Sequence, residues 1–364
     1  TTNFQTALAL DPNHLQAHYN LGCTLKDLGR LQEAISSWRK VTVLDSNHAI
    51  AHYNVGRGLS DLGNNDQAVI SYHKALAINP NFIDAHNSLG NSFLILGNLD
   101  EAIISFNNTL KLNPDFSTGH NNRGFVLYAQ GKYVEACDSF QKAILADPKF
   151  SDARNNLGIL FKDLGRLDEA LDQFKQILEF EPENPGAHNY MSTALLLSGK
   201  LEKGWEEYEW RWKRKLEPLQ QRNFPQSRWR GEPLQGKSIL IWGEQGVGDE
   251  IIFSSMIPDV VATGAHCTIE CDPRLVSLFS RSFPKTWVHS RPYTEAERGV
   301  EFFDYQIPAG SLFAQFRKSI KDFPSRNSYL VVDERKQKLW RERILSLGSG
   351  LKIGVSWRSG VSSF

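Results

Sequence analysis

The chain has 364 residues, and its 41 Lys and Arg residues balance 41 Asp and Glu residues. This neutrality excludes a general polyanion binder, so we expect no nucleic-acid partner. The mean hydropathy of -0.39 and the lack of a long apolar run exclude a membrane-spanning helix, and the lack of a signal-peptide pattern favours a cytoplasmic location. Four cysteines are too few for disulfide bonds to stabilise a chain of this length. We expect them to be buried, reduced thiols rather than metal ligands.

Charge and tryptophan are distributed unevenly along the chain. Residues 1–200 contain 16 basic and 21 acidic residues, whereas residues 201–364 contain 25 and 20. Of the nine tryptophans, Trp38 alone precedes residue 205. This shift in composition predicts a domain boundary near residues 200–230.

A period of 34 residues dominates the first half. It is carried by prolines, by two series of glycines, and by alanines that are followed four residues later by an aromatic residue. The prolines are Pro12, Pro80, Pro114, Pro148 and Pro182, with Ser46 in the vacant slot. The glycines include Gly22, Gly56, Gly90, Gly124 and Gly158, and, seven residues further on, Gly29, Gly63, Gly97, Gly131 and Gly165. An Ala-x-x-x-aromatic pair lies on one face of a helix, so each unit reads as helix, Gly turn, helix, Pro turn.

These residues resemble the tetratricopeptide repeat (TPR) pattern. The resemblance implies five full repeats at 15–48, 49–82, 83–116, 117–150 and 151–184, and a degenerate repeat at 185–218. Residues 1–14 match the second helix of a further repeat. Because a solenoid normally begins with a capping unit, we expect the chain to be a piece of a longer protein.

Asparagine recurs on the face that lines the concave groove of TPR proteins. The predicted groove residues are Asn20, Asn54, Asn122 and Asn156, with further asparagines one position earlier in the later repeats. An amide both donates and accepts hydrogen bonds, so such a ladder suits the main chain of a bound peptide or protein. The arrangement resembles the TPR arm of O-GlcNAc transferase. The alternative is that these amides cap or bridge adjacent helices.

Histidine also repeats every 34 residues, for example at His18, His52 and His86. Successive helices pack about 8–10 Å apart, which is too far for two such side chains to share one metal ion. We therefore expect these histidines to pack or to line the groove, and we expect neither a metal nor a cofactor.

The pattern changes after a predicted linker at 219–236. The basic residues mixed with tryptophan before and within this linker are interleaved with glutamate, which favours a solvated helix face with domain-packing tryptophans. From Lys237 onwards short apolar strands alternate with helices, which predicts an open parallel sheet in a Rossmann-like half-domain at 237–333. Ligands bind such sheets at the carboxyl ends of the strands, and here that position is the turn GEQGVGDE at 243–250.

The turn lacks the residues of a phosphate-binding loop. Asp249 and Glu250 stand where Lys and Ser or Thr would be needed, and the glycines do not follow G-x-G-x-x-G. The pattern instead places Asp249 at a helix start, where it could act as a general base or serve as an ordinary cap.

The strings WRGEPLQGKSILIWGEQGVGDE, AHCTIECDPRL and KIGVSWRSG resemble TPR-linked glycosyltransferases related to heptosyltransferases. The resemblance implies the acceptor half of a GT-B fold, with Asp249 as the base and the turn residues Glu244, Gln245, Gly246 and Gly248 beside the acceptor. A nucleotide sugar is implied as co-substrate. Residues 334–364 match only the start of the second, donor-binding domain, with Arg358 placed to neutralise a diphosphate.

The sequence therefore predicts a TPR solenoid followed by a truncated GT-B enzyme that is inactive as given. The rival hypothesis is a non-catalytic TPR scaffold that only binds proteins. The sugar, the acceptor and the oligomeric state are not specified by the sequence.

Overall fold

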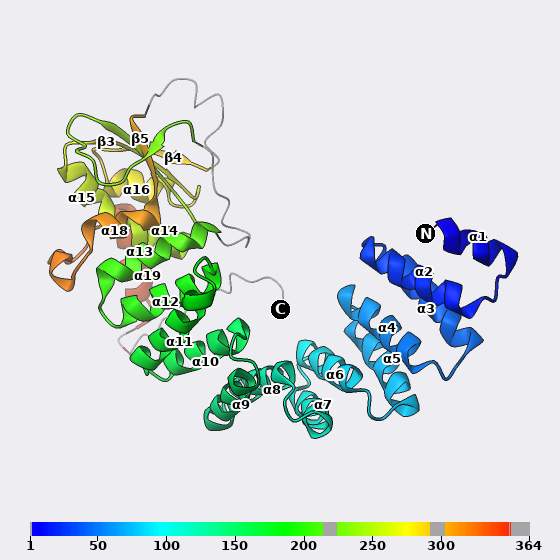
Figure 1. The fold of residues 1–364 in the computed structure, drawn as a ribbon. Helices are drawn as coiled ribbons and strands as arrows, with labels where there is room; N and C mark the ends of the chain where they lie inside the picture. Colours follow the sequence, from blue (N-terminus) through cyan, green and yellow to red (C-terminus); the bar gives the residue numbers. More distant parts are fainter. Residues whose placement is uncertain (1, 214–223, 292–302, 349, 351–364) are drawn as a thin grey trace. The chain divides into compact units, whose positions relative to one another are not determined.

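The computed structural model describes residues 2–213, 224–291, 303–348 and 350, and it consists of two compact units, Thr1–Ala194 and Leu195–Phe364 (Figure 1). The division falls inside the predicted degenerate repeat, 185–218, rather than in the predicted linker. Across the described ranges no helix has both the length and the apolar character that crossing a lipid bilayer requires.

The first unit is a helical solenoid in which each helix from α1 to α10 packs against the next along the chain (Figure 1). The helices are α1 (Thr2–Leu10), α2 (Leu15–Asp27), α3 (Leu31–Leu44), α4 (Ala49–Asp61), α5 (Asn65–Ile78), α6 (Ile83–Ile95), α7 (Leu99–Leu112), α8 (Ser117–Ala129), α9 (Tyr133–Ala146), α10 (Ser151–Asp163), α11 (Leu167–Phe180) and α12 (Pro185–Leu197). The 34-residue period thus corresponds to one helix pair, and the predicted solenoid is confirmed.

The turn inside each helix pair depends on the second glycine series. Gly29 has φ +74°, in the left-handed region that side chains with a Cβ rarely adopt. Its N–H donates to the carbonyl of Lys26 at 2.9 Å, and the N–H of Arg30 donates to the carbonyl of Leu25 at 2.8 Å. These bonds satisfy carbonyls that the end of α2 would leave unpaired.

The first glycine series has a different role, because it lets two helices of a pair approach closely. A Cβ on Gly22 would lie 2.5 Å from Nε1 of Trp38, and a Cβ on Gly158 would lie 2.5 Å from Cε1 of Phe174. Both rings are buried, at 2% and 0% exposure. The ring of the second helix therefore fills the space that the missing side chain leaves on the first.

The turn between repeats is held by side chains that the sequence pattern did not single out. Asp45 accepts a hydrogen bond from the N–H of Asn47 at 3.0 Å, and Asn79 accepts one from Asn81 at 3.2 Å. The same bond recurs at Asp11, Asn113 and Asp147. Each is an Asx turn that spans the proline slot and fixes the chain reversal between repeats.

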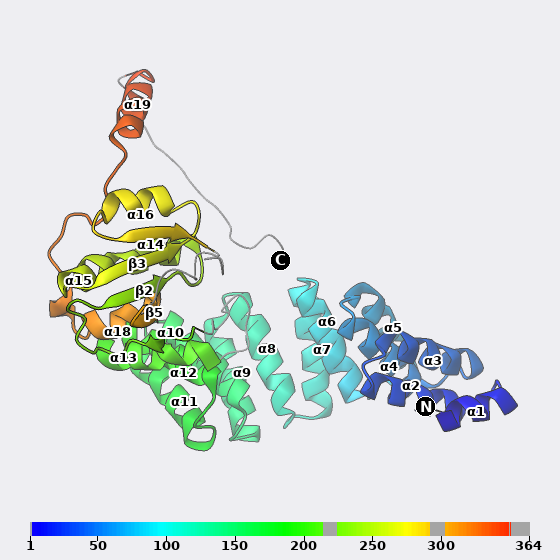
Figure 2. The same ribbon diagram turned by 90° about the horizontal axis from the view of Figure 1, so that it is seen from above.

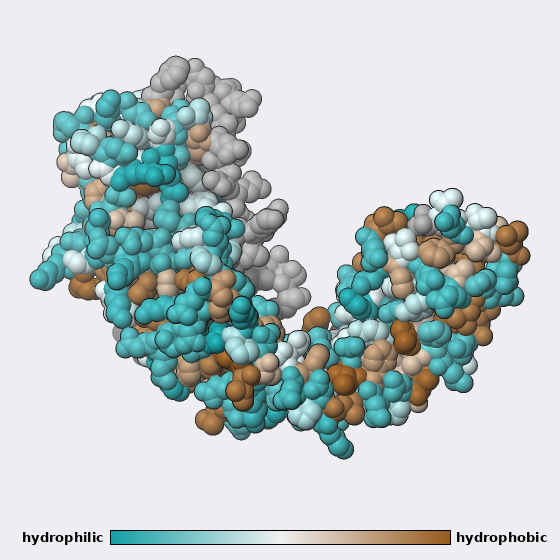
Figure 3. Space-filling view, in the orientation of Figure 1, coloured by the Kyte–Doolittle hydropathy of each residue, from teal (hydrophilic) through white to brown (hydrophobic). Residues whose placement is uncertain are grey.

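Apolar side chains are also exposed along the solenoid, for example Leu10, Val43 and Val134. On the face seen in Figure 3, hydrophobic residues lie in separate patches among hydrophilic ones. Isolated exposed apolar residues of this kind are ordinary on protein surfaces.

The second unit contains a five-stranded sheet in the order β1-β5-β2-β3-β4, and every neighbouring pair is parallel. The strands are β1 (Ser227–Arg228), β2 (Ser238–Trp242), β3 (His266–Cys271), β4 (Trp287–Ser290) and β5 (Tyr305–Pro308). The helices are α13 (Leu201–Tyr208), α14 (Val247–Phe253), α15 (Ile257–Ala262), α16 (Val276–Ser282), α18 (Phe313–Phe316) and α19 (Glu334–Leu345), with 3-10 turns η1 (Glu209–Lys213), η2 (Ser254–Met256), η3 (Ala309–Leu312) and η4 (Ile320–Asp322).

The predicted parallel sheet is confirmed, but the predicted linker is not wholly a linker. Ser227 and Arg228 form the edge strand β1, which pairs with Tyr305 and Gln306 of β5. A strand of two residues has too short a pattern to be recognised in the sequence. Residues 214–223 of the predicted linker lie outside the described residues.

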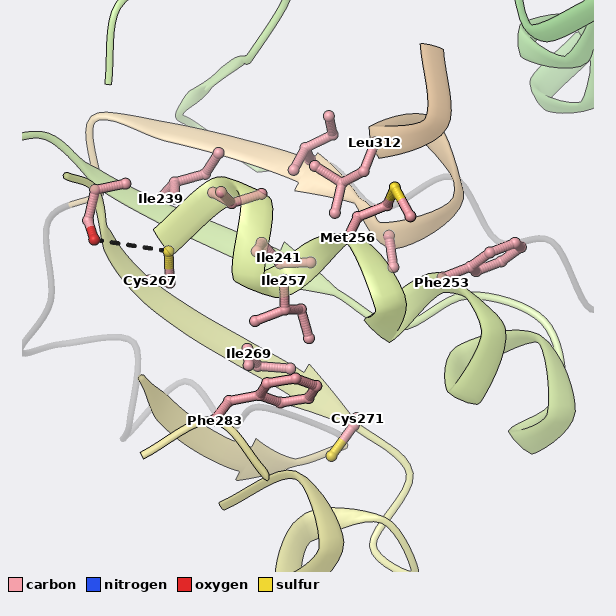
Figure 4. Packing of buried hydrophobic residues seen from close by; sticks show 14 of the residues in the cluster. Ile239, Ile241, Phe253, Met256, Ile257, Cys267, Ile269, Cys271, Phe283 and Leu312 are labelled. Atoms are coloured by element: carbon pink, nitrogen blue, oxygen red, sulfur yellow. Dashed lines mark hydrogen bonds between the residues drawn. The ribbon is translucent and has the colours of Figure 1, made fainter. Parts of the chain in front are cut away.

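The core of this unit lies between the sheet and the helices after β2 (Figure 4). Ile239 and Ile241 of β2 and Ile269 of β3 point toward Met256 and Ile257, and all five are nearly fully buried. The nearly continuous apolar run of β2 suits a strand covered on both faces, whereas β3 also buries the polar residues Thr268 and Glu270.

All four cysteines are free thiols, as predicted. Cys267 and Cys271 of β3 are buried, and burial raises the pKa of each thiol to about 12. Cys23 and Cys137 are half-buried rather than buried, which corrects the expectation for those two.

The predicted second domain, 334–364, begins with helix α19. All residues of this helix are exposed, and Figure 2 shows it standing apart from the sheet. Asp333 caps its first turn by accepting a hydrogen bond from the N–H of Lys336 at 3.1 Å. Residues 351–364, including Arg358, lie outside the described residues.

Candidate functional site

Asparagine amides form a hydrogen-bonded chain across three successive repeats of the solenoid. Nδ2 of Asn122 in α8 donates to Oδ1 of Asn91 at 3.0 Å and to Oδ1 of Asn87 at 3.3 Å, both in α6. Nδ2 of Asn121 donates to Asn122 at 3.3 Å. Nδ2 of Asn156 in α10 donates to Asn121 at 2.9 Å. The amides are therefore oriented by one another rather than by their own helices alone.

The other two predicted groove residues lie outside this chain of amides. Asn20 accepts a hydrogen bond from Nε2 of Gln16 in the same helix at 3.0 Å, and Asn54 hydrogen-bonds Tyr19 of the preceding repeat. All four predicted asparagines are half-buried. Asn122 and Asn156 each bridge two helices of neighbouring repeats, as the alternative interpretation of these asparagines expects.

The repeated histidines hold the turns between repeats. Nε2 of His120 lies 2.7 Å from the carbonyl oxygen of Pro114, and Nε2 of His86 lies 2.9 Å from that of Pro80. His18 and His188 make the same contact with a proline carbonyl, and His52 makes it with the carbonyl of Ser46 in the vacant proline slot. Each histidine thus closes the turn that precedes its helix. Within the described part of the chain no group of three His, Cys, Asp or Glu side chains is arranged to hold a metal ion.

The turn between β2 and α14 lies at the carboxyl end of the sheet, where the sequence placed an acceptor site. Asp249 is half-buried in the first turn of α14, and its Oδ2 accepts a hydrogen bond from the N–H of Gly246 at 3.2 Å. This is the geometry of a helix cap. Gln245 has φ +62°, which is uncommon for a residue with a side chain.

Glu244 of the same turn takes part in a buried ion pair. Its two carboxylate oxygens accept hydrogen bonds from Nε and Nη2 of Arg211, each at 2.9 Å. Glu244 is 4% exposed and Arg211 is 2% exposed. Oε1 of Glu244 also accepts from the N–H of Gly310 at 2.8 Å, and Nη2 of Arg211 also donates to Ser311 at 2.7 Å. Glu244 therefore ties the turn to η1 and η3.

Gln245 is held from the same side. Its Nε2 donates to the hydroxyl of Tyr208 at 2.9 Å, and burial raises the pKa of that hydroxyl to about 12. The guanidinium of Arg211 stacks on the ring of Tyr208, with its central carbon 4.1 Å from the ring centre. The side chain of Gln245 is thus bound to the last residue of α13, and that of Glu244 to η1 directly after it.

Acidic and basic groups also pair at the ends of β3 and β4. Oε2 of Glu250 accepts a hydrogen bond from the N–H of Asp272 at 2.8 Å, and Oε1 lies 2.5 Å from Nη2 of Arg291. Burial raises the pKa of Glu250, whereas the hydrogen bond from Arg274 lowers the pKa of Asp272 to about 2. A Cβ on Gly243 would lie 2.8 Å from the Glu250 carboxyl carbon, so a side chain at this position would displace the Glu250 carboxylate.

Arg211 is the main residue that sequence reasoning missed. The segment GWEEYEWRWKRK was interpreted as a solvated face with packing tryptophans. The packing part is correct, because the Trp205 ring lies 4.6 Å from that of Phe313 and its Nε1 donates to the carbonyl of Arg317 at 3.0 Å. The solvated part is wrong for Arg211, whose partner is 33 residues away in sequence. No local pattern could have indicated that partner.

The helix pairs, the glycine turns and the packed rings together define the first unit as a solenoid of tetratricopeptide repeats. Residues 3–36 and 127–192 match models described as tetratricopeptide repeat, and residues 59–97 and 90–131 match a model described as TPR repeat. Tetratricopeptide repeats are protein-interaction modules.

The following similarities to individual proteins each cover part of the chain. Protein FlbA of Caulobacter vibrioides is 34% identical over 177 residues, which cover 44% of this chain and 29% of that protein. The chain thus spans less than a third of the relative it matches. The thermophilic TPR protein TTC0263 of Thermus thermophilus is 25% identical, covers 50% of this chain and 99% of its own, and has a TM-score of 0.43. The Cut9-Hcn1 hetero-tetramer of the APC/C is 18% identical, covering 57% of this chain and 41% of that chain, with a TM-score of 0.50, and it shows the fold alone.

Proposed function

We propose that the solenoid binds an extended segment of a protein partner and that the amides of α6, α8 and α10 hold its main chain. The observation that supports this proposal is the chain of amide hydrogen bonds centred on Asn122. Side chains that are already oriented lose little conformational entropy when a ligand arrives. The row of amides is therefore prepared to bind before the partner is present.

The amides retain bonding capacity beyond their mutual contacts. An amide oxygen has two lone pairs and an amide nitrogen has two N–H groups. Oδ1 of Asn122 accepts one hydrogen bond from Asn121, and Nδ2 of Asn156 donates one to Asn121. One acceptor site and one donor site thus remain for the peptide N–H and C=O groups. Because main-chain groups are the same in every residue, such recognition tolerates different partner sequences.

The test replaces Asn122 and Asn156 by alanine together. A peptide selected from a random library against the whole chain serves as the probe, and its affinity is measured by fluorescence anisotropy. Losing two net hydrogen bonds is expected to weaken binding by about tenfold. Replacing one peptide amide by an ester in the probe is expected to weaken binding as well, whereas alanine substitutions in the probe are expected to be tolerated.

The matched control is Asn64→Ala with Asn98→Ala. Both residues are exposed, precede second helices of the same solenoid and make no side-chain cap bond. This pair is expected to leave the affinity within about twofold of the original value. Equal affinities for the two double variants would refute the role of the amide ladder.

A second candidate function is sugar transfer, with the second unit as the acceptor half of a GT-B glycosyltransferase. Two observations support it. Residues 225–364 resemble glycosyltransferases related to heptosyltransferases, and Asp249 lies beside the carboxyl end of β2. Next to it, a Cβ added to Gly248 would meet no atom of the described residues within 4 Å. The helix surface at Gly248, the residue before Asp249, is therefore open. In this proposal Glu244 and Gln245 support the turn, and a nucleotide sugar is the co-substrate.

This second candidate is tested by a glycosyl-transfer assay on the product of the complete gene. Asp249→Asn keeps an acceptor for the Gly246 N–H but cannot take a proton from a hydroxyl. We expect a large loss of transfer at unchanged thermal stability. A rate equal to that of the unmodified protein would remove Asp249 as the base, and the proposed peptide binding would stand unaffected.

A further inference from the structure

Helix α19 and the turn that follows it present apolar side chains that are largely exposed. Trp340, Ile344 and Leu347 follow one another at spacings of four and three residues, so they share one face of the helix and of that turn. Their exposed fractions are 54%, 45% and 72%. We name these three residues the apolar face of α19. Scattered exposed apolar residues are ordinary, whereas several on one helix face indicate an interaction site.

Positive charge is concentrated on the same helix. The 12 residues of α19 include five basic and two acidic ones. The basic residues, all of them exposed, are Arg335, Lys336, Lys338, Arg341 and Arg343. In the described part of the chain none of the five forms an ion pair with a carboxylate. The charge of the helix is therefore available to a partner.

The basic side chains border the apolar face. Lys336 precedes Trp340 by four residues and Arg343 follows it by three, which places both on the same side of the helix as the ring. The central carbon of the Arg343 guanidinium lies 5.1 Å from the centre of the Trp340 ring. Glu334 and Glu342 stand six residues before and two residues after Trp340, and they lie on other sides of the helix. The apolar face thus has a rim of positive charge.

This combination is complementary to the surface of an anionic lipid membrane. Negatively charged headgroups attract Lys and Arg, and the boundary with the acyl chains takes up Trp and aliphatic side chains. The apolar stems of Lys336 and Arg343 let their charges stay at the headgroups while Trp340 enters more deeply. A nucleic acid would pair with the cations but would leave Ile344 and Leu347 in water. Because α19 has 12 residues and seven of them are charged, it is too short and too polar to span the bilayer.

We propose that α19 binds the surface of a membrane that contains anionic lipids and lies along it with the apolar face toward the acyl chains. This inference uses no residue of the solenoid and none of the β2–α14 turn, so it is independent of both proposed functions. Because every side chain of α19 is exposed, substitutions in this helix leave the packing around the sheet unchanged.

The first test measures cosedimentation of the full chain with lipid vesicles. Vesicles of equimolar phosphatidylcholine and phosphatidylglycerol are the probe, and vesicles of pure phosphatidylcholine are the neutral reference. We expect the chain to sediment with the anionic vesicles at low salt and to remain in solution with the neutral ones. At about 1 M salt, where the screening length falls to about 3 Å, the chain is expected to leave the anionic vesicles. Absence of sedimentation with the anionic vesicles at low salt would overturn the proposal.

A pair of charge variants locates the binding surface. Lys336→Gln with Arg343→Gln is expected to weaken binding by about tenfold or more, because each basic residue near an anionic surface strengthens binding about fivefold. The matched control, Lys285→Gln with Lys321→Gln, removes two exposed lysines of the same unit outside α19 and should leave the affinity within about twofold. Equal losses in the two double variants would show that the charge of the whole unit attracts the vesicles, which would refute the role of α19.

A second measurement reports on the apolar face. Brominated acyl chains quench tryptophan fluorescence on contact, and the anionic vesicles are prepared with them. The original chain is compared with Trp340→Phe, which keeps an aromatic side chain on the face. We expect the original chain to lose the larger fraction of its fluorescence, because Trp340 enters the membrane. Equal quenching of the two chains would contradict the proposed orientation of the helix.

Discussion

Glu244→Ala is expected to lower the free energy of unfolding of the second unit by about 3–5 kcal/mol, because it leaves a buried guanidinium without its main counter-ion. Arg211 is 2% exposed, and its remaining acceptors would be the carboxylate of Glu209, at 3.0 Å from Nη1, and two neutral groups, the carbonyl of Tyr208 and the hydroxyl of Ser311. The N–H of Gly310 would lose its acceptor as well. The penalty is therefore that of a buried charge left with a single carboxylate partner, together with an unpaired amide, rather than the loss of a surface contact.

The measurement is urea unfolding followed by tryptophan fluorescence, which reports mainly on the second unit because only Trp38 lies in the first. The double variant Arg211→Met with Glu244→Ala removes the stranded charge and is expected to regain part of the lost stability. Lys237→Met breaks the exposed pair with Asp304 and should hardly move the transition. A Glu244→Ala variant as stable as the Lys237→Met variant would contradict the assigned role of the buried pair.

Gly158→Ala is expected to destabilise the solenoid by about 1–3 kcal/mol, the usual cost of overpacking a core. The new Cβ would lie 2.5 Å from Cε1 of Phe174, whose ring has no exposed surface and hence little room to move. An alanine in a helix would ordinarily be favoured over glycine. Helix propensity alone predicts that Gly158→Ala stabilises the solenoid, whereas the contact with Phe174 predicts that it destabilises it.

Thermal unfolding followed by far-UV circular dichroism checks this result. Adding Phe174→Leu to Gly158→Ala makes space for the methyl group and is expected to recover part of the loss, although the same substitution alone destabilises the protein. A Gly158→Ala variant more stable than the original chain would show that the two helices separate at low cost.

The solenoid was predictable because its information is local and repeated. Three kinds of residue recur every 34 positions: the glycine series of Gly29, the aromatic series of Phe174 and the prolines between repeats. Several imperfect signals therefore support the same period. The roles of the two glycine series still required coordinates. Both series recur every 34 residues, but a positive φ at Gly29 and a ring against Gly22 are different physical constraints.

The candidate sites were less predictable because their contacts join distant segments. The sequence indicated that Asn122 and Asn156 share a face but not that they contact Asn87 and Asn121 of neighbouring repeats. It placed Asp249 at a helix start, which is correct, and left open whether it caps the helix. It gave no sign that Glu244 pairs with Arg211, since a buried ion pair looks like two ordinary surface charges until the fold brings them together.

The ion pair between η1 and the β2–α14 turn has a mechanical consequence. Helix α13 continues directly into η1, and its Trp205 donates a hydrogen bond to the carbonyl of Arg317. Because Arg211 of η1 is bound to Glu244, α13 and the β2–α14 turn are held together. A displacement of α13 that bent the chain at η1 would break the hydrogen bonds between Arg211 and Glu244, which hold the turn that leads into α14 and Asp249.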